Sequence, residues 1–518
     1  MDAAALAAAR PAELPAAAAA YGALAAALEG HHQAWARQTA GRVHGSGWQG
    51  RAAELAGAAV DRVTGRLQAA WVELTLVQET LRQAAEAFAV AQAALPGDPS
   101  GAVAAAERAD TAAAQRLTAL AAAARDGRAL TPAAAVAGLG RLSDPREPLN
   151  AALRALLPPP GAGPGEVAAW WRGLAPGARA ALTEGRPDLV GALDGLPARD
   201  RDRANRLQLS RLLEHPDVLS GPLREGLRAV AARLAEGDPA GGDLLLLALG
   251  AQGQGRAVLG YGDPDTADDV AVYVPGFGTE LAAAGRGDAE RAERIRTAAA
   301  RCGGGRTTAA MVWLGYDAPP NEGLSLRSAE VAGDARAKAG AADLNRFLGG
   351  LRAARPGEPA HVTAVGHSYG SLVVGLAARQ DGTGMDDVVL VGSPGAGVDR
   401  ADGLKVGAGH VYVGVAEHDP VGRLPAGSGV AGGMLLGGPA AAALGQATGP
   451  NELWFGRDPA DAGFGAHRFE VAPGDPEHPF ASHSAYFDAA PDGPSASLEN
   501  IGRVVAGRGA ETTAVPPR

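Results

Sequence analysis

A single short segment constrains the fold of this chain more than any other feature. An apolar run, Val362–Val365, leads into Gly366-His367-Ser368-Tyr369-Gly370 and then directly into a helix-forming stretch. In a Gly-x-Ser-x-Gly turn between a strand and a helix, small residues let the two elements approach closely and the serine hydroxyl is exposed. The pentapeptide alone is weakly specific in a chain with 74 glycines. Its strand–turn–helix context predicts a nucleophile at Ser368 between Gly366 and Gly370; the alternative is a structural turn.

Beyond residue 255, short apolar segments alternate with helical stretches such as Ser371–Arg379. This alternation is typical of a mostly parallel sheet with helices on both faces. The fold class predicted is therefore α/β, preceded by an all-α region. The predicted strands are Arg256–Tyr261, Val270–Val274, Thr308–Leu314, Val362–Val365, Val388–Val391, His410–Val415 and Arg468–Val471.

The N-terminal region is rich in alanine and poor in strand formers, which favours helices. The sequence predicts three of them, at about Pro15–Val43, Ala52–Leu95 and Gly101–Arg125. The second ends at Pro96-Gly97-Asp98-Pro99, where a helix cannot continue. Its apolar residues are spaced to form a stripe on one helical face, and they are Leu55, Ala59, Val63, Leu67, Leu74, Val77, Leu81 and Phe88.

A glycine-rich turn with one tryptophan lies between the first two predicted helices. Its tripeptide Trp48-Gln49-Gly50 resembles that of the WXG helical hairpins of type VII secretion. The alternative is a helical turn with a core tryptophan. The family's secretion signal, a tyrosine followed four positions later by an acidic residue, is missing, since Tyr21 is the only tyrosine before residue 261. The resemblance implies a helical protein partner or self-association through residues 1–125.

The order of these segments predicts a domain organisation. A Pro/Gly-rich stretch, Leu157–Gly165, is typical of a linker. We expect a helical module at 1–125, a linker at 126–165, a helical connector at 166–245, an α/β domain at 246–510 and a disordered tail at 511–518.

A serine nucleophile needs a histidine base and an acid that orients it, and in this type of fold they follow in the order Ser, acid, His. Asp419, in a turn after the second predicted strand beyond the elbow, is the predicted acid, with Glu417 as the nearby alternative. His483, in the loop after the last predicted strand, is the predicted base, and His478 in the same loop is the alternative.

Acyl transfer also needs N–H donors for the developing oxyanion. The residue after the nucleophile, Tyr369, supplies one predicted backbone donor. Phe277, in the loop Pro275–Thr279 that follows the predicted strand Val270–Val274, supplies the other. A plain glycine-rich turn is the alternative for that loop.

Several segments resemble an actinobacterial α/β-hydrolase family of largely uncharacterised function. The resemblance covers about residues 165–508 and implies the α/β-hydrolase fold and a Ser368–Asp419–His483 triad, with no known substrate. The matching segments are Val272–Thr279, Gly366–Gly370, Val391–Gly395, Phe464–Phe469 and the helical lead-in Leu193–Arg206.

Composition excludes several function classes. A net charge of −10 argues against a nucleic-acid partner, and a single cysteine, Cys302, excludes an intrachain disulfide. The N-terminus lacks the features of a signal peptide, and no apolar stretch is long enough to span a membrane. We expect a soluble protein that is cytoplasmic or exported by a type VII-like route, and no metal, nucleotide or other cofactor.

The function predicted from these residues is a serine hydrolase that cleaves an ester or related acyl bond in a small-molecule or lipid-like substrate. One alternative is a non-catalytic interaction protein on a hydrolase scaffold, and another is an acyltransferase that uses the same triad. The Gly/Ala-rich region Leu424–Trp454 is either an apolar lid or a loop that reflects composition.

Overall fold

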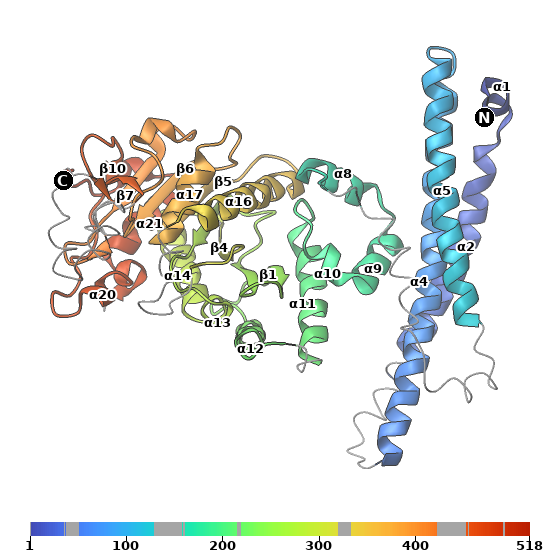
Figure 1. Ribbon diagram of the computed structural model, residues 1–518, viewed down its shortest axis with the longest axis horizontal. Helices are drawn as coiled ribbons and strands as arrows, with labels where there is room; N and C mark the ends of the chain where they lie inside the picture. The colour runs from blue at the N-terminus through green and yellow to red at the C-terminus, as the bar shows by residue number, and fades with distance from the viewer. Residues whose placement is uncertain are drawn as a thin grey trace. The chain divides into compact units, whose positions relative to one another are not determined.

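In the computed structural model the chain forms two compact units (Figure 1). The first comprises Met1–Pro160 with Trp170–Arg186, and the second comprises Gly161–Ala169 with Pro187–Arg518. Trp48-Gln49-Gly50, and Leu424–Trp454 apart from residues 452–453, lie outside the described residues. The structure describes residues 2–35, 37, 51–128, 158, 161–214, 219–319, 333–421, 452–453, 455–490 and 493–517.

The first unit is helical, as the composition predicts. The long helix α4 packs against both α2 and α5, and α9 also contacts it. The second and third predicted helices are confirmed close to their expected bounds. The first begins as expected, but the end predicted for it at Val43 lies outside the described residues; α1 is an addition that the sequence did not indicate. The helices are α1 (Ala3–Ala8), α2 (Leu14–Trp35), α4 (Arg51–Ala94), α5 (Pro99–Arg128) and α9 (Pro176–Gly185).

The buried face of α4 differs from the predicted apolar stripe. Val63 is exposed, whereas the polar Thr75 and Glu79 are buried. The reason is that α4 contacts helices on more than one side, so its buried residues do not follow one stripe. Arg82 donates to both carboxylate oxygens of Glu79, which compensates for the burial of its charge. The side chains of Leu55, Ala59 and Leu67 are outside the part that the structure describes.

The second unit is built on an eight-stranded sheet with the order β1-β2-β4-β3-β5-β6-β7-β10. All neighbours from β4 to β10 are parallel, and β2 is antiparallel to both β1 and β4. The predicted strands are confirmed except for the last, where β10 shares only Arg468 with the predicted Arg468–Val471; β1 was not predicted. The strands are β1 (Leu244–Gly250), β2 (Arg256–Tyr261), β3 (Asp269–Val274), β4 (Thr308–Leu314), β5 (His361–His367), β6 (Asp387–Val391), β7 (Val411–Gly414) and β10 (His467–Arg468).

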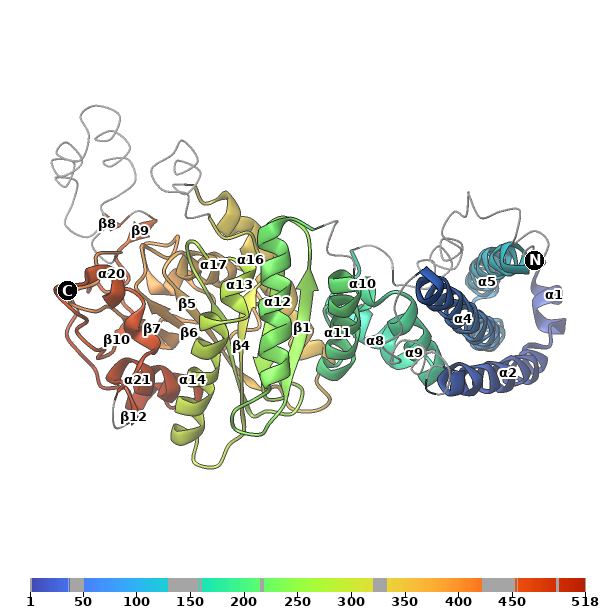
Figure 2. The same cartoon turned by 90° about the horizontal axis from the view of Figure 1, so that it is seen from below.

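Helices cover both faces of this sheet (Figure 2). Along β3, Val270, Val272 and Val274 belong to the core beneath α16 and α17, while Ala271 and Tyr273 belong to the core beneath α12, α14 and α21. This alternation is why the strands are apolar throughout. The helices are α10 (Pro187–Val190), α11 (Ala198–Glu214), α12 (Gly221–Glu236), α13 (Leu281–Ala284), α14 (Gly287–Cys302), α16 (Ala335–Ala354), α17 (Tyr369–Ala378), α20 (Pro479–Ser482) and α21 (Ala496–Val505), with α8 (Pro164–Gly173) divided between the units.

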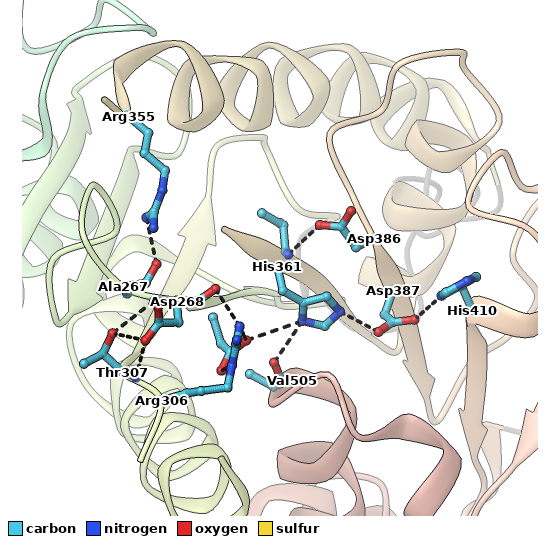
Figure 3. Close-up of polar contacts among 12 residues, drawn as sticks. Ala267, Asp268, Arg306, Thr307, Arg355, His361, Asp386, Asp387, His410 and Val505 are labelled. Carbon is cyan, nitrogen blue, oxygen red and sulfur yellow. Dashed lines mark hydrogen bonds and ion pairs between the residues drawn. The ribbon is translucent and has the colours of Figure 1, made fainter. Parts of the chain in front are cut away.

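Charged side chains join the amino ends of the parallel strands (Figure 3). Asp387, the first residue of β6, lies 2.8 Å from His361 Nε2 and 2.8 Å from His410 Nδ1. Asp269, the first residue of β3, is fully buried and accepts two hydrogen bonds from Arg306. These contacts lie at the amino ends of the strands, whereas the elbow lies at their carboxyl ends.

The C-terminal residues, expected to be a disordered tail from residue 511, instead pair with the sheet. Val515 N donates to Arg468 O, and Glu470 N donates to Thr513 O. Short pairs of strands complete the unit: β8 (Glu452–Leu453) with β9 (Gly456–Arg457), and β11 (Ala489–Ala490) with β12 (Gly493–Pro494). Among the described helices of the chain, none is long and apolar enough to cross a membrane.

Candidate active site

Ser368 lies in a strained turn between β5 and α17. With φ of 54° and ψ of −130°, it is the only residue other than glycine with a positive φ in the described part of the chain. Such a conformation costs about 1–3 kcal/mol and persists only where the surroundings enforce it. Here they do: a Cβ on Gly370 would lie 2.1 Å from Val274 O, and one on Gly366 would lie 2.6 Å from Ser371 Cα. Both glycines of the motif are therefore required by close backbone approach.

Two further serines, which were not predicted from the sequence, form hydrogen bonds that stabilise the turn. The Ser371 hydroxyl donates to Ser368 O at 2.5 Å and lies 2.7 Å from Ser393 Oγ. Ser393 Oγ also accepts from Gly395 N at 3.1 Å. Both side chains are buried. The only signal for them was that Ser393 falls in the family-like segment after β6.

His483 and Asp419 form a direct pair beside this turn. His483 Nδ1 lies 3.0 Å from each carboxylate oxygen of Asp419, which is fully buried. Gly392, with φ of 56°, fits against the pair, because a Cβ there would lie 2.9 Å from both Asp419 Oδ2 and His483 Cε1. Val391, the residue before Gly392, accepts a hydrogen bond from Ser368 N at 3.1 Å through its backbone carbonyl. The predicted serine, acid and histidine are thus gathered around the carboxyl end of β6.

The two alternative residues lie elsewhere. Glu417 is exposed in the turn after β7. His478 is also exposed, and its Nδ1 lies 2.9 Å from Asp475 Oδ2. Of the two histidines in that loop, His483 is the one whose ring contacts Asp419.

Asp419 is held in its ionised form by its contacts. Burial alone would raise the pKa of this carboxyl, but hydrogen bonds from His483, the Tyr486 hydroxyl and the Val421 amide hold the pKa below its usual value. Tyr486 was not predicted as a site residue, although it lies only three positions after His483. The sequence could not indicate that its hydroxyl reaches Asp419, 67 residues away along the chain.

His367, the residue before Ser368, is buried next to His483. Its ring lies 4.8 Å from the His483 ring, and its Nε2 donates to the His483 backbone oxygen at 2.7 Å. Burial, with the neighbouring charges of His483 and Arg291, lowers the pKa of His367 well below its usual value. His367 is therefore a neutral hydrogen-bond donor that anchors the His483 segment.

The loop after β3 packs directly on the elbow. A Cβ on Gly276 would lie 2.6 Å from Ser368 Cβ and 2.9 Å from Tyr369 N. Tyr316 donates to Pro275 O and Gly278 N donates to Pro319 O, each at 2.8 Å, which fixes the loop on both sides of Phe277. The Phe277 side chain is 42% exposed, so it is not a core anchor of the loop.

Tyr369 is the first residue of α17, and its amide is therefore one of the N–H groups that have no acceptor within the helix. Both predicted oxyanion donors, the amides of Phe277 and Tyr369, belong to segments in contact with Ser368. Among the residues that the structure describes, no three His, Cys, Asp or Glu side chains are arranged to hold a metal ion.

Comparison with known proteins finds similarity over parts of this chain. Residues 250–428 match the model of an alpha/beta hydrolase family. An uncharacterized protein of Mycobacterium tuberculosis, Rv2079, is 31% identical over 407 residues, which cover 72% of this chain and 60% of the relative. An uncharacterized protein of Mycobacterium bovis, Mb0988c, is 40% identical over 171 residues, which cover 31% of this chain and 61% of the relative.

The chain therefore spans about 60% of the length of these curated relatives. No solved structure matches it significantly. The family match covers the elbow, the loop after β3 and Asp419, and the mostly parallel sheet places helices on both faces. The second unit of the chain thus has the α/β-hydrolase fold, preceded by a separate helical unit.

Proposed function

We propose that the chain is a serine hydrolase that cleaves an ester or related acyl bond through a covalent acyl-enzyme. The observation that carries this proposal is the pairing of His483 Nδ1 with the buried carboxylate of Asp419, next to a serine in the strained turn of an elbow. With Nδ1 engaged by the carboxylate, Nε2 is the ring nitrogen that can act as a base towards a hydroxyl.

In the proposed reaction, Ser368 Oγ attacks the carbonyl carbon of the substrate while His483 Nε2 takes its proton. Asp419 keeps the imidazole in the required tautomer and stabilises the imidazolium. The amides of Phe277 and Tyr369 donate to the oxyanion of the tetrahedral intermediate. His483 then gives its proton to the leaving alcohol, and the acyl group stays on Ser368. Water, deprotonated by the same histidine, attacks the acyl-enzyme. As the bond to Ser368 Oγ breaks and the carboxylic acid leaves, the histidine returns the proton to the serine oxygen.

The direct test is labelling of the whole 518-residue chain with a fluorophosphonate probe, which reacts with activated serines, followed by mapping of the modified peptide. We expect labelling at Ser368 that is lost in Ser368→Ala. The loop after β10 offers a matched pair of histidine variants. His483→Asn should slow labelling by about 10²–10⁴-fold through loss of the general base, whereas His478→Asn should label like the wild type.

Two results would contradict the proposal. One is folded wild-type protein that does not react with the probe. The other is equal loss of labelling in the His483 and His478 variants, which would mean that the Asp419-paired histidine has no special role. Thermal unfolding of each variant establishes that it is folded.

A further inference from the structure

Tyr486 occupies a position between the segment that carries the proposed base and the turn that carries the proposed acid. Its side chain is buried, and its hydroxyl donates to Asp419 Oδ2 at 2.5 Å. The same hydroxyl oxygen accepts from Ala416 N at 3.0 Å. One phenol therefore contacts the acid itself and the backbone of the turn that leads to it.

The carboxylate of Asp419 is fixed from two sides. Oδ1 accepts from Val421 N at 2.8 Å, Oδ2 accepts from Tyr486, and His483 Nδ1 lies 3.0 Å from each oxygen. Without the phenol, the imidazole would be the one remaining partner of Oδ2 among the described residues. The carboxylate could then rotate about its Cβ–Cγ bond, and the ring would lose its fixed orientation.

The bond from Tyr486 also affects the charge of the pair. An O–H donor on an ionised carboxylate forms a short, charge-assisted hydrogen bond. It withdraws negative charge from Oδ2, one of the oxygens that faces His483 Nδ1. Within the part of the chain that the structure describes, the titratable side chains that act on or are acted on by Asp419 are His483, Tyr486 and His367, and Arg291 acts on His367.

We propose that Tyr486 is a positioning residue for the reaction described under Proposed function, on which this inference rests. Its hydroxyl sets the orientation of Asp419 and shares the carboxylate charge. Because Tyr486 is three residues from His483, the same side chain also ties the base segment to the acid turn. The segment is tied a second time through the hydrogen bond from His367 to His483 O.

The test measures the rate constant of fluorophosphonate labelling from acid to alkaline pH in the full chain. Loss of a hydrogen bond to a charged group predicts that Tyr486→Phe labels about tenfold more slowly at neutral pH. In this variant Asp419 no longer shares its charge with a hydroxyl, so the full charge of the carboxylate faces the imidazole. The acid limb of the pH profile, the range in which the labelling rate rises with pH, should therefore move to higher pH. The labelling rate of the variant should be partly restored in alkaline buffer.

Tyr412→Phe is the matched control. Tyr412 is a buried tyrosine on β7, in the same hydrophobic core as Tyr486, and its ring stacks on His467. This variant should keep the wild-type profile. In addition, Tyr486→Phe should slow labelling much less in the background of Asp419→Asn, because a residue that acts through Asp419 loses its effect when the carboxylate is gone.

A purely structural role for Tyr486 would lower the rate evenly at every pH and would add to the effect of Asp419→Asn; either result overturns the inference. If Tyr486→Phe does not fold, replacement of Tyr486 by 3-fluorotyrosine provides the test, since a stronger donor should move the acid limb to lower pH. If the wild type is labelled and Tyr486→Phe has the same pH profile as the wild type, only the role of Tyr486 is contradicted. Unlabelled, folded wild type contradicts the proposed function as well.

Discussion

At Ser368 the backbone is held in a strained conformation by neighbours that approach at the limit of contact. Gly276 is one of these neighbours from outside the elbow, since a Cβ there would lie 2.6 Å from Ser368 Cβ and 2.7 Å from His367 O. No side chain larger than hydrogen fits without displacing backbone. The close approach of the loop after β3 to the elbow therefore requires glycine at position 276.

We predict that Gly276→Ala slows the labelling of Ser368 by about 10²-fold, because displacement of reacting groups by about 1 Å has an effect of that size. The global cost should be modest, about 1–3 kcal/mol of unfolding free energy for an overpacked site. Labelling kinetics and thermal unfolding measure the two effects. Gly287→Ala is the control, since nothing lies within 4 Å of a Cβ at that position. Wild-type labelling in folded Gly276→Ala would be incompatible with the assigned role of the loop.

At the scale of elements, the strands and helices around the elbow follow from local patterns in the sequence. Apolar runs and the Gly-x-Ser-x-Gly turn predict β5 and α17, and chain order predicts Asp419 and His483. What the sequence did not predict depends on contacts between distant segments. The hydroxyl of Tyr486 meets Asp419 across 67 residues, and Ser371 meets Ser393 across 22. Neither contact has a sequence pattern of its own.

Two other elements show why local patterns were insufficient. The apolar run of β1 has no polar alternation, because the residues of this strand belong to the cores on both faces of the sheet. In α4, the buried Glu79 is compensated by Arg82 and Gln83, so a polar residue occupies the helix–helix contact. Its burial depends on tertiary neighbours rather than on helical spacing.

The charged contacts of His361 at the amino ends of the parallel strands lead us to predict that the stability of the fold depends on pH (Figure 3). Burial lowers the pKa of His361, but the hydrogen bond and charge of Asp387, with smaller effects from Val505 O and Asp386, raise it overall above its usual value. Asp269, paired with Arg306, lies 3.7 Å from His361 Nδ1, and His410 shares Asp387. Because the pKa of His361 is higher in the folded than in the unfolded chain, protonation of His361 stabilises the fold. This stabilisation is complete below the pKa of a histidine in the unfolded chain, about 6.5, and is lost as the pH rises through the pKa of His361 in the folded chain.

We therefore expect the unfolding free energy of the second unit to decrease from about pH 6 to about pH 8. His361→Asn should flatten this dependence and should cost about 1–3 kcal/mol at the acidic end, because a buried carboxylate loses a partner. Urea unfolding at a series of pH values measures both effects, and His478→Asn, which changes an exposed histidine, is the control. An equal slope in wild type and His361→Asn would show that this histidine does not carry the dependence.

At the scale of the whole molecule, the two units have separate hydrophobic cores. The clusters on the two faces of the sheet contain only residues from Ala198 onwards, and the cluster of Leu6, Ala91, Ala102 and Ala106 lies within the first unit. Every residue proposed to take part in the reaction belongs to the second unit. A part of a chain with its own core can fold independently.

A fragment of residues 161–518 should therefore fold and should label at Ser368 within about twofold of the full-length rate, since distant and independent sites have nearly additive effects. The fragment also keeps Trp170–Arg186, the segment of the first unit that contains α9 and the end of α8, because this segment lies between two parts of the second unit in the chain. Circular dichroism and thermal unfolding establish its folding, and labelling kinetics compare it with the full chain. A folded fragment that labels far more slowly would mean that the helical unit takes part in forming the reactive state. Equal rates would instead assign to the helical unit a role that is separate from the chemistry at Ser368.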